Sequence, residues 1–257
     1  MGGRGSRSGG LGAGGGLGGA GGGMGGALFG TAGATTPPPV TPGQPVPAIT
    51  IQQLQSMNDQ EFATYMTGLK STPIDANTYY NHDWDTQRLV ANMPELNRAP
   101  QIVDAQTFAG LKGQTVYRTV NSSGNDTAVD ICARTMTSDV STIGGGRMGD
   151  GFYFANSLNG SQAYGAARNN INRTATMTAK LNSNARVVSD TQLRNMLSRE
   201  PAAVRNAVSN MSGGGWSGSS KMAYALYKGY NVVNDGSYYN VIDRNAVTFS
   251  GGLTPMS

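Results

Sequence analysis

Gly149–Tyr164, with the sequence GDGFYFANSLNGSQAY, is the stretch that decides the fold of this chain. Its two leading glycines indicate a tight turn, because glycine adopts backbone conformations that are closed to other residues. Phe152–Ala155 then predicts a strand, and Ser157–Arg168 predicts a helix capped by Asn156 or Ser157. In a purely structural interpretation, the tyrosine and serine side chains of this stretch only pack and cap these elements.

A functional interpretation starts from the spacing of three side chains. Ser161 and Tyr164 are three residues apart, so they share one face of the predicted helix. Tyr153 lies on the strand that enters this helix. The corner can therefore aim two phenol rings and one hydroxyl group into the same cleft. Such a set suits a flat ring that carries an amide, and aromatic faces attract the ring further if it is cationic.

Helices and strands alternate irregularly on both sides of this stretch. Asn58 and Glu61 form a capping-box pattern at the start of an apolar-periodic segment, which predicts a helix there. Helices are expected at 59–69, 85–93, 190–197, 201–209 and 219–228, and strands at 115–120, 175–181, 186–189, 232–233, 238–242 and 246–249. Because no regular βαβ repeat is present, the pattern predicts an α+β fold.

Composition divides the 257 residues into a tail and one domain. Residues 1–34 are mostly glycine, and such a sequence cannot bury enough apolar surface to offset chain entropy, so we expect a disordered tail. Residues 35–48 are rich in proline and predict an extended linker. Residues 49–98 are expected to form a helical part, and residues 99–257 the core of the domain.

Several classes of protein and site are disfavoured by the composition. The net charge of +4 fits either solubility alone or a weak attraction to nucleic acid. The single cysteine, Cys132, excludes an internal disulfide and lies in an apolar run typical of a buried thiol. The single histidine, His82, disfavours a zinc site or a histidine-based triad, so no metal is expected. No apolar stretch is long enough to predict a membrane span.

The central stretch resembles the NAD-binding motif of the poly-ADP-ribose polymerase and diphtheria-toxin-like ADP-ribosyltransferases. In that family a Gly-x-Gly-x-Tyr-Phe-Ala strand precedes a helix that bears serine and tyrosine. Here Ser161 follows Tyr153 by 8 residues and Tyr164 follows it by 11, and both intervals match the family. The resemblance implies that Tyr153 and Tyr164 sandwich the nicotinamide ring of NAD, and that Ser161 bonds its carboxamide.

An upstream strand supplies a second part of the resemblance. Tyr117-Arg118-Thr119 lies where the family carries His-Gly or Arg-Gly. The resemblance implies that Arg118 contacts phosphate or ribose oxygens of NAD, a role that suits its planar, bidentate guanidinium. Thr119 would then offer backbone groups to the carboxamide, although the family has glycine at this position.

The C-terminal strand departs from the family pattern. The family ends on a strand with a catalytic glutamate, which opposes the positive charge of the transition state. Tyr238 occupies that position here, and Asp235 is the nearest carboxylate in the sequence. The resemblance therefore includes Arg118, Tyr153, Tyr238 and Asp235 as candidate catalytic residues, and it puts polymer formation in doubt.

The order of the motifs over about residues 50–250 resembles a group of phage- and prophage-encoded ADP-ribosyltransferase-like proteins. This resemblance implies two packed, mainly antiparallel sheets with flanking helices in the 99–257 core. It also implies an enzyme that transfers one ADP-ribose from NAD to a bacterial protein or nucleic acid, in the host cytoplasm or carried in a virion. Two alternatives stay open: an inactive NAD-binding module on the same fold, and a structural protein that contacts other virion proteins.

Overall fold

The computed structural model describes residues 41, 44–74, 84–123, 125–137, 141–144, 148–166, 174–211, 216, 218–252 and 254–255. The predicted glycine-rich tail at 1–34 and most of the 35–48 linker lie outside these residues. Within them, no helix is both long and apolar enough to cross a membrane.

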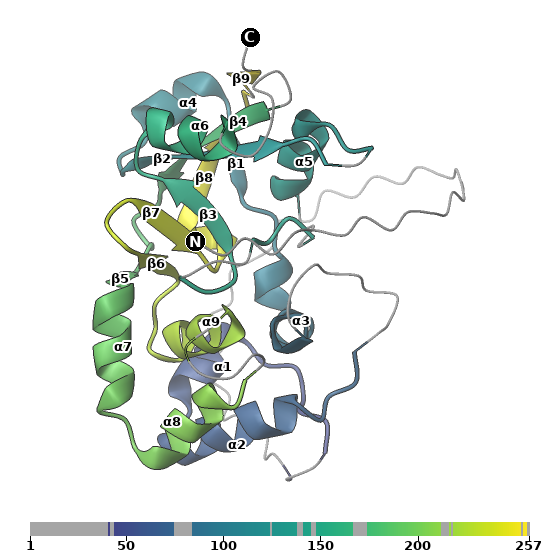
Figure 1. The fold of residues 1–257 in the computed structure, drawn as a ribbon, viewed down its shortest axis with the longest axis vertical. Helices are drawn as coiled ribbons and strands as arrows, with labels where there is room; N and C mark the ends of the chain where they lie inside the picture. The colour runs from purple at the N-terminus through teal and green to yellow at the C-terminus, as the bar shows by residue number, and fades with distance from the viewer. Residues whose placement is uncertain are drawn as a thin grey trace, which may run out of the picture.

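One mixed sheet forms the upper part of the molecule in Figure 1. Its strands are β1 (Gln101–Val103), β2 (Thr115–Asn121), β3 (Phe152–Ala155), β4 (Thr174–Leu181), β5 (Val187–Ser189), β6 (Val232–Asn234), β7 (Tyr238–Val241), β8 (Val247–Ser250) and β9 (Thr254–Pro255). They run in the order β1-β8-β4-β2-β3-β7-β6-β5, with β9 beside β4. The β1–β8 and β5–β6 pairs are parallel and the other pairs are antiparallel, so the α+β class is confirmed.

The expectation of two separate packed sheets is wrong for the described strands, because they pair into one continuous sheet. The joint between its halves is narrow: β2 pairs with β3 only through Tyr117 and Ala155. By contrast, β2 pairs with β4 along its whole length. The sheet therefore consists of a β1-β8-β4-β2 half and a β3-β7-β6-β5 half that separate beyond this one pair. Local sequence patterns carry no information on such a contact between distant segments.

Helices cover the sheet and fill the lower part of the molecule (Figure 1). They are α1 (Ile51–Ser56), α2 (Asp59–Leu69), α3 (Trp84–Asn92), α4 (Ala105–Gly110), α5 (Ala128–Thr135), α6 (Leu158–Ala166), α7 (Asp190–Ser198), α8 (Ala202–Ser209) and α9 (Gly218–Tyr227), with 3-10 turns at Pro94–Asn97 and Arg244–Ala246. The N-terminal helices α1 and α3 pack against α9, and α2 packs against α8. The helical part is thus built from two segments that lie far apart in the sequence, residues 51–92 and 202–227.

Local capping explains where several helices begin. The predicted capping box is present: the Asn58 side chain accepts from the backbone N–H of Glu61, and the Glu61 carboxylate accepts from that of Asn58. Ser189 forms the same arrangement at the start of α7. Pro201 lies one residue before α8 rather than at its first position. The short elements β1, α4 and α5 were not predicted, because their apolar periodicity is too brief to stand out.

The β2–β4 ladder has one apolar and one polar face. Val116 pairs with Ala179 and both side chains are buried, as is Met177 opposite Arg118. The alternate residues of the two strands are polar on the other face: Thr115, Tyr117, Thr119 and Asn121 on β2, and Thr174, Thr176, Thr178 and Lys180 on β4. Helices α5 and α6 both pack against this ladder. The polar face is the one that receives Ser161 of α6, since Ser161 bonds Thr119 there.

Candidate functional site

The narrow joint of the sheet places the predicted tyrosines on the polar face. Tyr117 pairs with Ala155, Ala155 pairs with Tyr238, and Tyr153 pairs with Asn240. Paired residues in a sheet point to the same side, and every second residue of a strand does so too. These five side chains, from β2, β3 and β7, therefore share one face of the sheet.

Helix α6 brings Ser161 and Tyr164 to the same face. The Ser161 hydroxyl lies 2.8 Å from the Thr119 hydroxyl of β2, and the Ser161 residue is almost fully buried. The Tyr164 ring meets the Tyr238 ring edge to face, with 6.1 Å between their centroids. Tyr164 is 52% exposed, so about half of this residue lies open to solvent. The structure thus gathers Thr119, Tyr153, Ser161, Tyr164 and Tyr238 on one face.

The phenol of Tyr153 is fixed by the loop before its own strand. Its hydroxyl donates to the Gly149 carbonyl at 2.6 Å and accepts from the Met148 backbone N–H at 3.0 Å. Burial raises the pKa of Tyr153, and the Met148 hydrogen bond lowers it by less, while the charges of Asp150, Tyr164 and Asp235 raise it further. The Tyr153 side chain is therefore neutral and fixed on this face, whereas the Tyr164 side chain is exposed.

The two leading glycines of the central stretch, Gly149 and Gly151, are required by close packing. Gly149 has a φ of +100°, and a Cβ on it would lie 3.0 Å from both the Gly218 carbonyl oxygen and the Lys221 Cβ. A Cβ on Gly151 would lie only 2.1 Å from the Asn240 Oδ1. Each glycine therefore lets the turn approach a neighbouring element, α9 in the first case and β7 in the second.

Asn240 is a residue of this region that sequence reasoning missed. Its side chain is fully buried, and its Nδ2 donates to the carbonyls of Met148 and Asp150 at 3.1 and 3.2 Å. These bonds link the turn at residues 148–150 to β7 and thereby fix the position of Tyr153 on the polar face. The only signal in the sequence was a polar residue in the predicted strand, two residues after the position that the family gives to glutamate.

Asp150, between the two glycines, joins the sheet to the helical part. Its carboxylate accepts from the Thr86 hydroxyl of α3 at 2.5 Å and packs against Gly218, the first residue of α9. It is almost fully buried. An acidic group at a helix N-terminus is stabilised by the helix dipole. Asp150 is thus a structural anchor beneath the site.

Arg118 points away from the other predicted site residues. Its side chain lies on the apolar face of β2, with the guanidinium carbon 5.6 Å from the centre of the Phe152 ring. The guanidinium donates to the carbonyl of Thr142 at 2.7 Å and to that of Tyr153 at 3.5 Å. Burial lowers the pKa of Arg118 to about 10, so it stays protonated at neutral pH. Tyr164 lies close enough for its charge to raise the pKa of Arg118, but the described hydrogen bonds of the guanidinium go to backbone carbonyls rather than to Ser161.

A second arginine, Arg244, packs against the same aromatic ring as Arg118. Its guanidinium carbon lies 4.8 Å from the centre of the same Phe152 ring, and it donates to the carbonyls of Thr135 and Thr137. Arg118 and Arg244 therefore hold backbone carbonyls before and after residues 138–140, which lie outside the described chain. By these contacts, the two arginines hold the chain between α5 and β3 in place.

Carboxylates are scarce at this face. Asp235 lies in the turn between β6 and β7, where its Oδ1 accepts from the backbone N–H groups of Ser237 and Tyr238, both at 2.9 Å. All three glutamates are in the helical part: Glu61 caps α2, Glu95 accepts from the Ile51 N–H, and Glu200 contacts Tyr224 and Lys228. Asp235 is thus the carboxylate that the predicted site offers.

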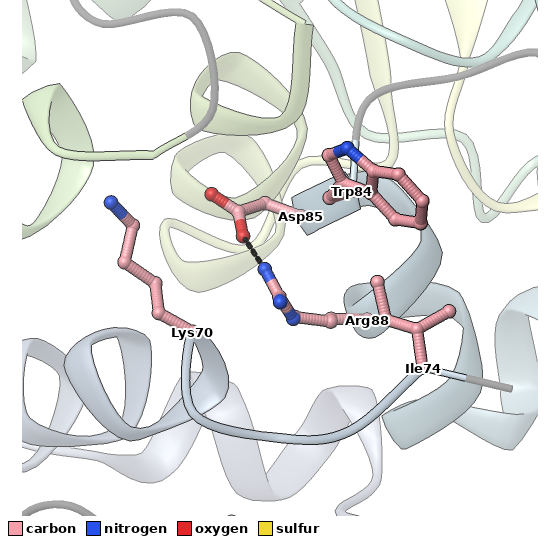
Figure 2. Close-up of a pocket in the computed structure, with 5 residues that line it drawn as sticks. All are labelled: Lys70, Ile74, Trp84, Asp85 and Arg88. Atoms are coloured by element: carbon pink, nitrogen blue, oxygen red, sulfur yellow. Dashed lines mark hydrogen bonds and ion pairs between the residues drawn. The ribbon is translucent and has the colours of Figure 1, made fainter. Parts of the chain in front are cut away.

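An open pocket of about 420 Å³ lies in the helical part, away from this face. Figure 2 shows its lining residues, Lys70, Ile74, Trp84, Asp85 and Arg88. Arg88 bonds the Asp85 carboxylate at 2.8 Å and the Thr72 carbonyl at 3.0 Å, so the central charges of the pocket neutralise each other. None of the residues predicted for the NAD site lines it.

Comparison with known proteins gives no relative for this chain: no family model, no curated protein and no solved structure matches it. Any functional assignment depends on the motif intervals in the sequence and on the arrangement of side chains described above.

Proposed function

We propose that this protein binds NAD at the face formed by β2, β3, β7 and α6 and transfers a single ADP-ribose to a bacterial protein or nucleic acid. One observation carries the proposal. Tyr153, Ser161 and Tyr164 have the intervals of a nicotinamide-binding motif, and their side chains gather on one sheet face beside Tyr238. The placement adds to the motif, since residue intervals alone do not determine which face of a sheet a helix covers.

The aromatic groups suit the positively charged nicotinamide ring of NAD. Tyr153 offers a fixed ring, and Tyr164 and Tyr238 offer an edge-to-face pair of which Tyr164 is largely exposed. A cationic ring over such faces gains about 0.5–2 kcal/mol for each contact. The attraction disappears when the glycosidic bond breaks and nicotinamide leaves as a neutral ring, which favours its release.

The reaction requires opposition to positive charge on the ribose. The bond between ribose C1′ and the nicotinamide nitrogen breaks, and its electron pair stays on the nitrogen. The acceptor's nucleophilic atom then bonds C1′ and loses a proton to solvent or a base. The sugar passes through an oxocarbenium-like state, which a nearby carboxylate stabilises. We assign this electrostatic role to Asp235, and we assign the Tyr238 hydroxyl as a hydrogen-bonding group for the ribose.

Arg118 acts in this proposal as a positioning residue. Its bonds to the carbonyls of Tyr153 and Thr142 hold β3 against the segment that precedes it. A direct contact with NAD phosphate, as the sequence resemblance implies, requires the guanidinium to leave the Phe152 ring and turn toward the gap between β2 and β3. Its assigned role rests on the hydrogen bonds that it donates to the carbonyls of Tyr153 and Thr142.

The test is release of nicotinamide from labelled NAD by the full chain, with and without a bacterial lysate. Tyr164→Ala is expected to weaken NAD binding about tenfold, because it removes one aromatic contact. Leu158→Ala is the matched control, since Leu158 is an exposed apolar residue of the same helix. Asp235→Asn is expected to lower the rate of release while leaving NAD binding in place. Equal activity in Tyr164→Ala and wild type, or no release at all, contradicts the proposed enzyme.

A second function is favoured by the residue at the glutamate position. Tyr238 stands there, and all three glutamates are engaged in the helical part. A protein with this face but without sufficient catalytic charge would bind NAD and leave it intact. Calorimetry separates the two functions: heat of NAD binding without nicotinamide release supports the binding module, and release supports the transferase.

A further inference from the structure

Helix α7 lies at the edge of the molecule and is covered by little else. Figure 1 shows it at the left side, between β5 and α8, and these are the elements that it mainly packs against. Of its nine residues only Leu193 is buried. Thr191, Asn195 and Ser198 are exposed on the side opposite to Leu193, since 3.6 residues make one turn. The helix therefore presents a ridge of short polar side chains to solvent.

Three exposed arginines surround this ridge: Arg194, Arg199 and Arg205. Arg194 and Arg199 lie about 140° apart around the axis of α7, so they flank the ridge on its two sides. Arg205 comes from α8, and its Nη1 lies 3.5 Å from the carbonyl oxygen of Ser198, at the end of the ridge. The ridge and the three arginines together form what we call the α7–α8 surface.

The positive charge of this surface is not cancelled by the carboxylates of residues 190–210. Asp190 lies 2.9 Å from the Lys221 ammonium group, and Glu200 lies 2.8 Å from that of Lys228. Arg194 is 3.7 Å from Asp190 and its side chain is 61% exposed, so water weakens this contact. The two acids and the two lysines balance each other. The three arginines therefore leave this surface with a charge of about +3.

We infer that the α7–α8 surface binds duplex DNA, with α7 in the major groove. An α-helix with its side chains is about 10–12 Å across, and the major groove of DNA is about 12 Å wide. Arginines on both flanks of the helix reach the phosphates of the two strands that border the groove. The hydroxyl and amide groups of the ridge then face the base edges, which carry hydrogen-bond donors and acceptors.

The composition of the ridge favours DNA over an acidic protein as the partner. Protein interfaces usually depend on aromatic or large apolar side chains that are buried at their centre. The ridge offers Thr191, Asn195 and Ser198 instead, with cations beside them. The inference does not require NAD to bind. Together with the proposed function, it brings the transferase to DNA and makes nucleic acid the favoured acceptor.

The experiment measures binding of the full chain, without NAD, to a labelled DNA duplex of about 20 base pairs by fluorescence anisotropy. Three phosphate contacts contribute about −2.7 to the slope of log K against log salt concentration. A rise from about 50 to about 200 mM salt is therefore expected to weaken the wild type about fortyfold more than the triple variant Arg194→Gln, Arg199→Gln, Arg205→Gln. Each single variant is expected to reduce the steepness of the slope by about 0.9.

Arg98→Gln is the matched control for Arg194→Gln. The Arg98 side chain is 60% exposed and lies 3.7 Å from Glu95, which closely resembles the exposure and ion pair of Arg194. Arg98 lies outside the α7–α8 surface, so its variant is expected to keep the slope of the wild type. An RNA duplex of the same sequence is expected to bind about tenfold more weakly, because its major groove is too deep and narrow for side chains to read.

Three outcomes would overturn the inference. Equal slopes for the wild type and the triple variant would mean that the arginines do not contact DNA. Equal binding of the RNA and DNA duplexes would exclude α7 from the major groove. Binding of a polyglutamate peptide through the same arginines, without binding of DNA, would identify an acidic protein as the partner. Because NAD is absent throughout, none of these results bears on nicotinamide release, and the proposed function is tested separately.

Discussion

Replacing Gly151 by alanine is expected to destabilise the protein because Gly151 lies directly against the Asn240 side chain. The new Cβ would lie 2.1 Å from the Asn240 Oδ1 and 2.9 Å from the Val241 carbonyl oxygen. Asn240 is fully buried and bonded to two carbonyls, so its side chain has no open space into which to move.

The magnitude follows from two contributions. Overpacking of a tight interior costs about 1–3 kcal/mol, and displacing Asn240 puts two hydrogen bonds at risk, each of about 1 kcal/mol. The expected loss is about 3–5 kcal/mol of the free energy of unfolding. For a domain of this size that corresponds to a fall in Tm of about 10 °C.

Urea unfolding of wild type, Gly151→Ala, Asn240→Ala and the double variant measures this loss. The double variant is expected to be more stable than the sum of the single losses predicts, because Asn240→Ala removes the closest clash. Gly236→Ala is the control: its φ of +95° is also unusual for alanine, but no atom lies within 4 Å of its Cβ, so a loss of about 1–2 kcal/mol is expected. A loss below 1 kcal/mol in Gly151→Ala would refute the packing argument.

Three further predictions concern titration and helix capping. Burial raises the pKa of the Cys132 thiol to about 12, so a thiol reagent at pH 8 is expected to react only after unfolding; rapid reaction of the native protein would contradict its burial. Burial also raises the pKa of Asp243, so the folded state holds this proton more tightly than the unfolded state, and stability is lost as pH rises through the two pKa values. Asp243→Asn is therefore expected to increase stability more at pH 7 than at pH 3.5 in urea unfolding, and an equal change at both pH values would count against this. Lys180 donates to three carbonyls at the end of α4, so Lys180→Met is expected to lower the free energy of unfolding by about 1–2 kcal/mol in urea unfolding. An unchanged free energy of unfolding would mean that these contacts do not stabilise the fold.

The long elements could be predicted because their signals are local. The capping box of Asn58 and Glu61 fixes the start of α2 at Asp59, and FYFA coincides with β3. The short elements β1, α4 and α5 could not, since a three-residue strand or a single pair of helical turns has too few apolar positions for a period to show. Their stability comes from contacts with β8, β2 and β4, which are distant in sequence.

The candidate site divides in the same way. Sequence intervals alone identified Tyr153, Ser161 and Tyr164 as one set, because a strand and the helix that follows it hold their geometry locally. The tertiary structure decided that Thr119 rather than Arg118 faces Ser161, that Thr119 links Ser161 to Thr176, and that Asn240 supports the glycine turn. Strand register causes this difference: a shift of one residue in pairing reverses every side chain, and only packing between distant segments sets that register.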